Sequence, residues 1–386
     1  MMPLKRYESL SKRVNRLLWL VDLLGAVLTA PTRLWRRCFG VRQQPIRKIL
    51  LTRCDGIGDL VCSIPAIHAI RKRFGDAELV LMVGPWSRDV AELIPGPDRL
   101  LVHAPWGYRR LRAVRSDRSL STDWDALRKI RRERFDIAID LRGDLLTLLP
   151  MLFWGIPRRV GRATRGGGFA LTQTVPPVGF GRQHEVDRTL DVAAAVGAAI
   201  DDRTATLDVS GALQKAAKQI YQDNKLNPAR TIILAPGAQW RWKQWPHFAE
   251  LVKQLLDEKK QVAIVGAAGD ASLAREIIEA VPGVVDLTGQ TDLQQLTALF
   301  SLCQGFVAVD SGPAHLAAAS GAAGVALFGS SEPERFAPIS DKVRVLHRTC
   351  PFFPCYQRGD CRIPEQWCME RIEADAVYQA LVDVLS

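Results

Sequence analysis

The sequence predicts an α/β protein with two Rossmann-like domains, each built on a parallel sheet, preceded by a basic helical arm. From Lys48 onward, short runs rich in Val, Ile and Leu alternate with stretches of helical periodicity, which is typical of parallel sheets covered by helices on both faces. The alternation weakens after Asp201 and begins again at Thr231, so the chain contains two such halves. Its 386 residues, 47% hydrophobic and 24% charged, suffice for two cores without disulfides or structural metals.

The expected elements divide the chain into an arm over residues 1–46, an N-terminal domain over 47–215 and a C-terminal domain over 216–386. In the N-terminal domain we expect strands at 48–52, 78–83 and 136–141, and helices at 65–74, about 124–134 and 185–196. In the C-terminal domain we expect strands at 231–235, 261–265, 306–309 and 324–328, and helices at 246–257, 272–280, 293–302 and 313–320. Residues 201–228 indicate an exposed helix and a linker, and packing of the last helix back on the N-terminal domain is left open.

The net charge of +11 is concentrated in the arm, where residues 1–48 carry eleven Lys or Arg and two acids. The apolar run at 17–30 contains 14 residues and is interrupted by Asp22, so it is shorter than the ~20 residues of a spanning helix. Basic residues flank it, and Trp19 and Trp35 lie near its ends, which favours a helix that lies in a membrane interface.

Other interpretations of the arm are weaker or stay open. The segment after the apolar run, 31–35, is a poor cleavage site for a signal peptide. A basic amphipathic helix packed on its own protein remains an alternative. No nucleic-acid-binding signature accompanies the basic residues, so a nucleic-acid partner is not expected.

The ends of the expected strands carry the candidate site residues, because ligands of open α/β sheets bind at the carboxyl ends of strands. After the first strand, Gly56 and Gly58 allow a tight turn, and Asp59 stands near the start of a helix. This is not the G-x-G-x-x-G fingerprint of dinucleotide binding. Asp59 could serve as a helix cap, or could take a proton from a sugar hydroxyl.

Two strand ends of the second half indicate an anion site. After 231–235, Gly237 and Ala238 offer backbone N–H groups and Lys243 offers charge for phosphates; the alternative is a solvated basic loop with buried tryptophans. After 306–309, the segment Asp310-Ser311-Gly312-Pro313-Ala314-His315 opens a helix whose N-terminus favours an anion. His315 alone has the alternative of an ordinary core histidine.

At these residues the chain resembles glycosyltransferase family 9, the ADP-heptose:lipopolysaccharide heptosyltransferases, from about Arg47 to the C-terminus. The motifs that carry the resemblance are Ile57-Gly58-Asp59 with Ser63-Ile64-Pro65-Ala66, the run 135–143, Arg159-Val160-Gly161, His184-Glu185-Val186-Asp187-Arg188, Pro236-Gly237-Ala238 with Lys243 and Trp245-Pro246, and Asp310 to Leu316 with Leu327-Phe328-Gly329. So many motifs in one order are specific for the family and less specific for the sugar.

The resemblance implies a GT-B fold, with two domains facing across a cleft, the N-terminal one for the acceptor and the C-terminal one for the nucleotide sugar. By position, Asp59 would be the general base and Lys243 would meet the donor phosphates. Asp310 would hold sugar hydroxyls. The remaining donor-binding residues would be Ser311, Gly312, His315, Gly237, Ala238 and Asp270. Asp270 is the acid nearest to the position at which the family binds the nucleoside, and it does not fall clearly on it.

The resemblance also implies the reaction and its setting. An acceptor hydroxyl attacks the anomeric carbon with inversion, and because no Asp-x-Asp motif is placed at a strand end, we expect neither metal nor cofactor. A lipid-linked saccharide acceptor fits a cytoplasmic enzyme held on the inner membrane by the arm. Arg109, Arg110 and Arg142 are candidates for acceptor contacts, and a solvated loop is the alternative for the arginine-rich stretch at 109–118.

Three matters stay open on the sequence. Cys350, Cys355, Cys361 and Cys368 lack the close C-x-x-C pairs of a zinc ribbon, so packed or free thiols are favoured over a metal. A nucleotide-sugar 2-epimerase has a related fold and needs no acceptor. A non-catalytic, membrane-associated assembly protein is the second rival.

Overall fold

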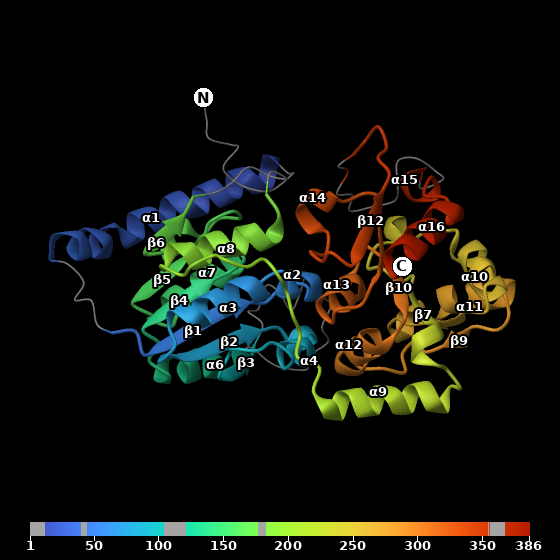
Figure 1. The fold of residues 1–386 in the computed structure, drawn as a ribbon. Helices are drawn as coiled ribbons and strands as arrows, with labels where there is room; N and C mark the ends of the chain where they lie inside the picture. The colour runs from blue at the N-terminus through green and yellow to red at the C-terminus, as the bar shows by residue number, and fades with distance from the viewer. Residues whose placement is uncertain (1–11, 40–44, 104–120, 177–182, 354, 356–366) are drawn as a thin grey trace. The chain divides into compact units, whose positions relative to one another are not determined.

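The structure, a computed structural model, describes residues 12–39, 45–103, 121–176, 183–353, 355 and 367–386. The chain divides into two compact units, Met1–Arg203 and Thr204–Ser386 (Figure 1). The expected boundary after residue 215 falls inside α9 (Gly211–Asp223), which packs on α12 (Leu293–Leu302). The exposed helix expected near residue 201–228 therefore belongs to the second unit.

The first unit is built on a six-stranded sheet in the order β3-β2-β1-β4-β5-β6. Its strands are β1 (Lys48–Arg53), β2 (Glu78–Val83), β3 (Arg99–Val102), β4 (Ile137–Asp140), β5 (Arg158–Arg162) and β6 (Gln173–Val175), and all pairs are parallel. The three strands expected here are confirmed. The other three were not predicted, because they are short or carry polar residues that mask an apolar run.

The second unit repeats this arrangement in the order β12-β11-β10-β7-β8-β9. Its strands are β7 (Thr231–Ala235), β8 (Gln261–Ile264), β9 (Val285–Asp286), β10 (Gly305–Val309), β11 (Gly324–Phe328) and β12 (Val343–His347). In each sheet the strand order reverses beside the first strand, between β1 and β4 and between β7 and β10. Such switch points are where doubly wound sheets bind ligands, at the carboxyl ends of the strands.

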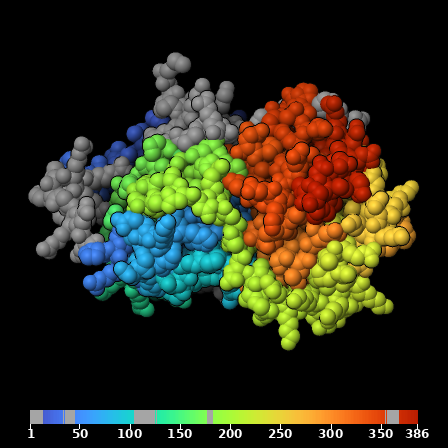
Figure 2. Space-filling view, in the orientation of Figure 1, coloured from blue at the N-terminus to red at the C-terminus, as the bar shows by residue number. Residues whose placement is uncertain are grey.

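Helices fill the connections between parallel strands, as the alternating sequence pattern predicts. Those of the first unit are α2 (Ile57–Val61), α3 (Ile64–Arg73), α4 (Arg88–Ala91), α6 (Ser121–Arg132), α7 (Leu145–Phe153) and α8 (Glu185–Ala195). Those of the second include α10 (Phe248–Asp257), α11 (Ala271–Ala280), α13 (Gly312–Ala319), α14 (Pro333–Phe336), α15 (Trp367–Glu370) and α16 (Ala374–Leu385). Helices α3 and α8 pack side by side and share one face of the first unit (Figure 2).

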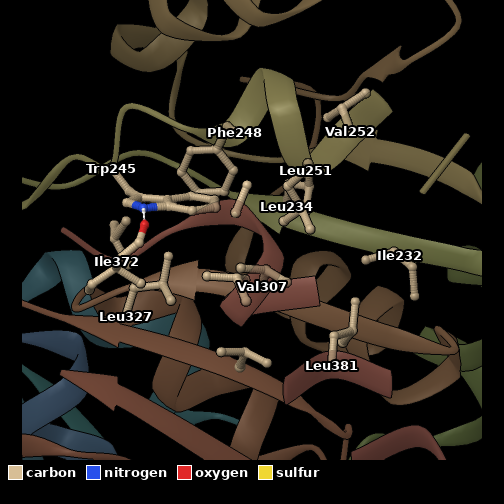
Figure 3. Packing of buried hydrophobic residues seen from close by; sticks show 14 of the residues in the cluster. Ile232, Leu234, Trp245, Phe248, Leu251, Val252, Val307, Leu327, Ile372 and Leu381 are labelled. Atoms are coloured by element: carbon tan, nitrogen blue, oxygen red, sulfur yellow. Dashed lines mark hydrogen bonds between the residues drawn. The ribbon is translucent and has the colours of Figure 1, made fainter. Parts of the chain in front are cut away.

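The core of the second unit includes the end of the chain. Trp245 donates its indole N–H to the carbonyl of Ile372 at 2.7 Å, and its ring meets Phe248 edge-on at 4.9 Å (Figure 3). Leu381 of α16 is buried in the same cluster. The last helix, α16 (Ala374–Leu385), therefore packs on the core of the second unit, and its packing on the N-terminal domain stays a prediction.

The arm forms one long helix, α1 (Lys12–Phe39), which lies along the first unit (Figure 1). Asp22 accepts a hydrogen bond from the backbone N–H of Gly167 at 2.7 Å, and Gly25 lies against the ring of Phe169. The helix thus does pack on its own protein. By length and composition alone, its segment Arg13–Thr32 could cross a membrane, whereas the apolar run at 17–30 by itself is shorter than a spanning helix.

Candidate active site

At the switch point of the first unit, a fully buried arginine ends strand β1. The Nε of Arg53 lies 2.8 Å from Asp55 Oδ1, and its Nη1 donates to the carbonyl of Leu141. Its Nη2 lies 3.1 Å from Glu185 Oε1 and 3.5 Å from Asp59 Oδ1. A buried guanidinium needs such partners, because an unpaired charge away from water is costly.

Asp59 is the exposed member of this group. Its side chain is 30% exposed, whereas those of Asp55 and Glu185 are 3% and 10% exposed. Its Oδ2 accepts the backbone N–H of Gly56 at 3.1 Å in the first turn of α2, so the capping contact considered from the sequence is present. Its Oδ2 therefore holds the turn and its Oδ1 faces the guanidinium, while the side chain as a whole stays partly exposed to solvent.

Arg142 follows β4 and reaches the same switch point. Its Nη1 donates to Asp55, and its Nε lies 2.8 Å from Asp144 Oδ2. Burial raises the pKa of Asp55, and although Arg53 and Arg142 oppose this effect, the net pKa is raised to about 6. The structure thus links Arg142 to Asp59 through Asp55 and Arg53. The other two acceptor candidates, Arg109 and Arg110, lie outside the described residues.

At the switch point of the second unit, Lys243 and Asp310 form an ion pair. The Lys243 Nζ lies 2.5 Å from Asp310 Oδ2. Lys243 belongs to the short helix η5 (Arg241–Lys243) after β7, and Asp310 directly follows β10. The hydroxyl of Ser331, after β11, donates to the same carboxylate. Ser331 was not predicted as a site residue, although the small polar turn after β11 was the signal for it.

Helix α13 begins beside Asp310. Its N-cap residue Ser311 donates its hydroxyl to the carbonyl of Val309 at 3.0 Å and does not cap the helix with its side chain. Gly312 is the first helical residue, so the first-turn N–H groups of α13 point out of the helix end beside Asp310. His315 is buried on this turn. Its role at a diphosphate stays a prediction beside the core-histidine alternative.

Gly237 and Asp270 meet at the ends of β7 and β8. A Cβ built on Gly237 would lie 2.4 Å from the carboxyl carbon of Asp270, so only glycine permits this approach. Asp270 Oδ2 accepts the N–H of Ala267 at 2.8 Å, which fixes the carboxylate in the turn η6 (Ala268–Asp270). Ala238 packs against the core of the unit. The structure therefore brings Asp270 to the predicted donor loop.

The late cysteines form no recognisable metal centre among the residues that the structure describes, where no three His, Cys, Asp or Glu side chains are grouped to hold an ion. Cys368 is buried beside Gly329, and Cys355 lies 3.9 Å from the carbonyl of Ser330. Cys361 lies outside the described residues. The expectation of packed or free thiols stays a prediction.

Comparison with known proteins places this site in context. The family model "Glycosyltransferase family 9 (heptosyltransferase)" matches residues 124–363. Lipopolysaccharide heptosyltransferase 2 of Escherichia coli (strain K12) is 29% identical over 364 residues, which cover 87% of this chain and 94% of that protein. The structure of E. coli ADP-heptose lps heptosyltransferase II superposes with a TM-score of 0.70 at 26% identity, covering 88% of this chain and 98% of that chain. E. coli heptosyltransferase WaaC with ADP gives a TM-score of 0.68 at 18% identity over 87% of this chain and 99% of that chain, a likeness of fold.

Proposed function

Because the chain belongs to glycosyltransferase family 9, the heptosyltransferases, we propose that it transfers a heptose from ADP-heptose to the core saccharide of lipopolysaccharide, with inversion and without a metal. The proposal rests on where the charged residues lie. Each unit presents charged residues at its switch point: an exposed acid in the first, and a lysine beside a helix N-terminus in the second.

The proposed reaction is a single displacement. The acceptor hydroxyl oxygen forms a bond to the anomeric carbon as the bond from that carbon to the diphosphate oxygen breaks, which inverts the centre. Asp59 takes the hydroxyl proton, and ADP leaves with the bonding electrons. The partial exposure of the Asp59 side chain supports this role, since a general base must reach the substrate hydroxyl while it is held in place.

Charge on the departing diphosphate is met by Lys243 and by the N–H groups at the start of α13. Fixed charges and dipoles aimed at developing charge are often the largest contribution to catalysis. In the structure Lys243 is held by Asp310, and Asp310 is also held by Ser331. Asp310 therefore keeps a partner when Lys243 turns to a phosphate. A cation in this place supports catalysis that needs no metal.

The epimerase and the non-catalytic assembly protein are not favoured by the family. A donor panel tests the proposal: ADP-heptose, a UDP-sugar and a GDP-sugar are titrated into the purified protein, and ADP release is then followed with and without a heptose-deficient core acceptor. We expect the tightest binding for ADP-heptose and release only with acceptor. Tighter binding of a UDP- or GDP-sugar, or release without acceptor, would contradict the proposal.

We further propose that the enzyme is cytoplasmic and lies on the inner membrane through α1. The face of α1 opposite Asp22 and Gly25 is apolar and exposed; Leu17, Leu20, Leu24, Val27 and Leu28 are 48–80% exposed. Arg13 and Arg16 are exposed at the start of the helix. A helix docked along its own domain while showing such a face suits an interface, because spanning would carry the docked domain into hydrocarbon.

Replacing Leu24 by Glu is expected to weaken binding to phosphatidylglycerol-containing vesicles by at least about tenfold, since burying a leucine is worth about 1.5–3 kcal/mol. Vesicle sedimentation measures this. Ile200→Glu is the matched control, because Ile200 is 50% exposed and lies outside α1. Equal loss in both variants, or none in Leu24→Glu, would count against the interfacial role of α1.

A further inference from the structure

Two carboxylates share one nitrogen of a buried guanidinium in the first unit. Arg53 Nη2 lies 3.1 Å from Glu185 Oε1 and 3.5 Å from Asp59 Oδ1. Glu185 begins α8, 126 residues after Asp59 along the chain, and was notable in the sequence only as part of a family motif. Because Glu185 holds the shorter contact, it takes part of the attraction that Arg53 would otherwise exert on Asp59.

The charges around Asp59 come from four elements. Arg53 ends β1, Asp55 lies in the following loop, Arg142 and Asp144 lie after β4, and Glu185 and Arg188 lie on α8, where Arg188 Nε is 3.3 Å from Glu185 Oε2. With all ionised, the four acids of this cluster outnumber its three arginines by one. Water solvates the excess charge best at the most exposed acid, which is Asp59.

Arg53 keeps its charge in this setting. Burial lowers its pKa, but Asp55, Glu185 and Asp59 more than offset that effect, so the net shift is upward. Arg53 thus attracts Asp59 at every pH at which the enzyme works. An uncompensated guanidinium would hold Asp59 ionised yet make it a poor proton acceptor, because attraction to a cation stabilises the charged carboxylate.

We propose that Glu185 is a positioning residue for the transfer reaction: by sharing Arg53 Nη2 with Asp59, it fixes the carboxylate of the base and raises its proton affinity. This rests on the assignment of Asp59 as the base in the proposed function. Glu185 itself is nearly buried and acts through Arg53. The signature of this role is the position of the acidic limb in the pH profile of kcat/KM for the acceptor.

Glu185→Gln keeps the shape of the side chain and removes its charge. We expect the acidic limb to move to lower pH by about 0.5–1 unit, because Asp59 then loses the neighbouring negative charge that shares Arg53 Nη2, while Asp55 still pairs with Arg53 Nε. The plateau of kcat is expected to fall by no more than about three- to tenfold, as a base whose pKa is lower by about 0.5–1 unit accepts the proton less well. Glu185→Asp withdraws the carboxylate from Nη2 and is expected to move the limb about half as far in the same direction.

The control is Asp187→Asn, which removes the same charge from the same helix, where Asp187 pairs with Arg203. Its limb is expected to stay in place. A purely structural effect lowers the whole profile without moving the limb; thermal unfolding and ADP affinity report on folding. An unmoved limb in either folded Glu185 variant overturns the proposal. If Asp59→Asn is inactive and the limb does not move, this inference alone fails; if Asp59→Asn remains active, the proposed mechanism fails first.

Discussion

Replacing Asp59 by Asn is expected to lower kcat about a thousandfold, within the 10²–10⁴-fold that a positioned general base contributes. Asparagine keeps an oxygen that can accept the N–H of Gly56, so the turn that starts α2 is preserved. It cannot take the hydroxyl proton. Initial rates of acceptor-dependent ADP release measure the loss, and the KM for the donor should change little, because the donor residues belong to the second unit.

The matched control for this change is Asp89→Asn. Asp89 is also an acid in the first turn of a short helix of the same unit, α4, and no catalytic role is assigned to it. Its kcat is expected to stay within twofold of the unsubstituted enzyme. Should Asp59→Asn retain more than a tenth of the activity while folded, Asp59 would be a helix cap and the base would have to be sought elsewhere.

Replacing Lys243 by Met is the second substitution expected to lower kcat strongly. We expect kcat to fall about 10²–10³-fold, as for the removal of one preorganised charge that stabilises the transition state. ADP binding should weaken as well, which calorimetry measures. Asp310 keeps the hydroxyl of Ser331 as a partner, so the loss of folding stability should be modest.

Lys253→Met removes an exposed lysine from α10 in the same unit and serves as the control. It should leave both kcat and ADP affinity unchanged. A Lys243→Met variant with full activity would show that the diphosphate charge is met by other groups, and would direct attention to the N-terminus of α13.

The alternation of apolar runs and helices was sufficient to predict both sheets, because their central strands carry buried apolar runs: Ile49-Leu50-Leu51 in β1, Ile232 to Ala235 in β7 and Phe306 to Val309 in β10. It did not predict β5, whose arginines interrupt the apolar pattern, or β6, a short edge strand with polar side chains. The arm was predicted from its charge, but its length was not, because the helix continues past the apolar run through Pro31.

Residues at strand ends could be placed from sequence because each follows a recognisable apolar run. Asp59 and Asp310 are of this kind. The partners that define their chemistry could not be predicted, because they come from distant parts of the chain. Glu185 reaches Arg53 only when α8 covers the sheet, and Ser331 reaches Asp310 only when β11 pairs with β10.

The hydrogen bond between Asp22 and Gly167 has a consequence for how the enzyme would meet its substrate. A membrane anchor that is joined to its domain by a flexible link only raises the concentration of the domain near the membrane. A helix that is docked on its domain, as α1 is, would also fix how the domain is oriented on the membrane. With the roll of α1 fixed by this contact and by Gly25 against Phe169, adsorption of its leucine face sets the tilt of the whole first unit above the lipid. On the proposed membrane association, the search for a lipid-linked acceptor would be a two-dimensional diffusion in which Asp59 keeps a constant height above the lipid while the unit turns about the membrane normal.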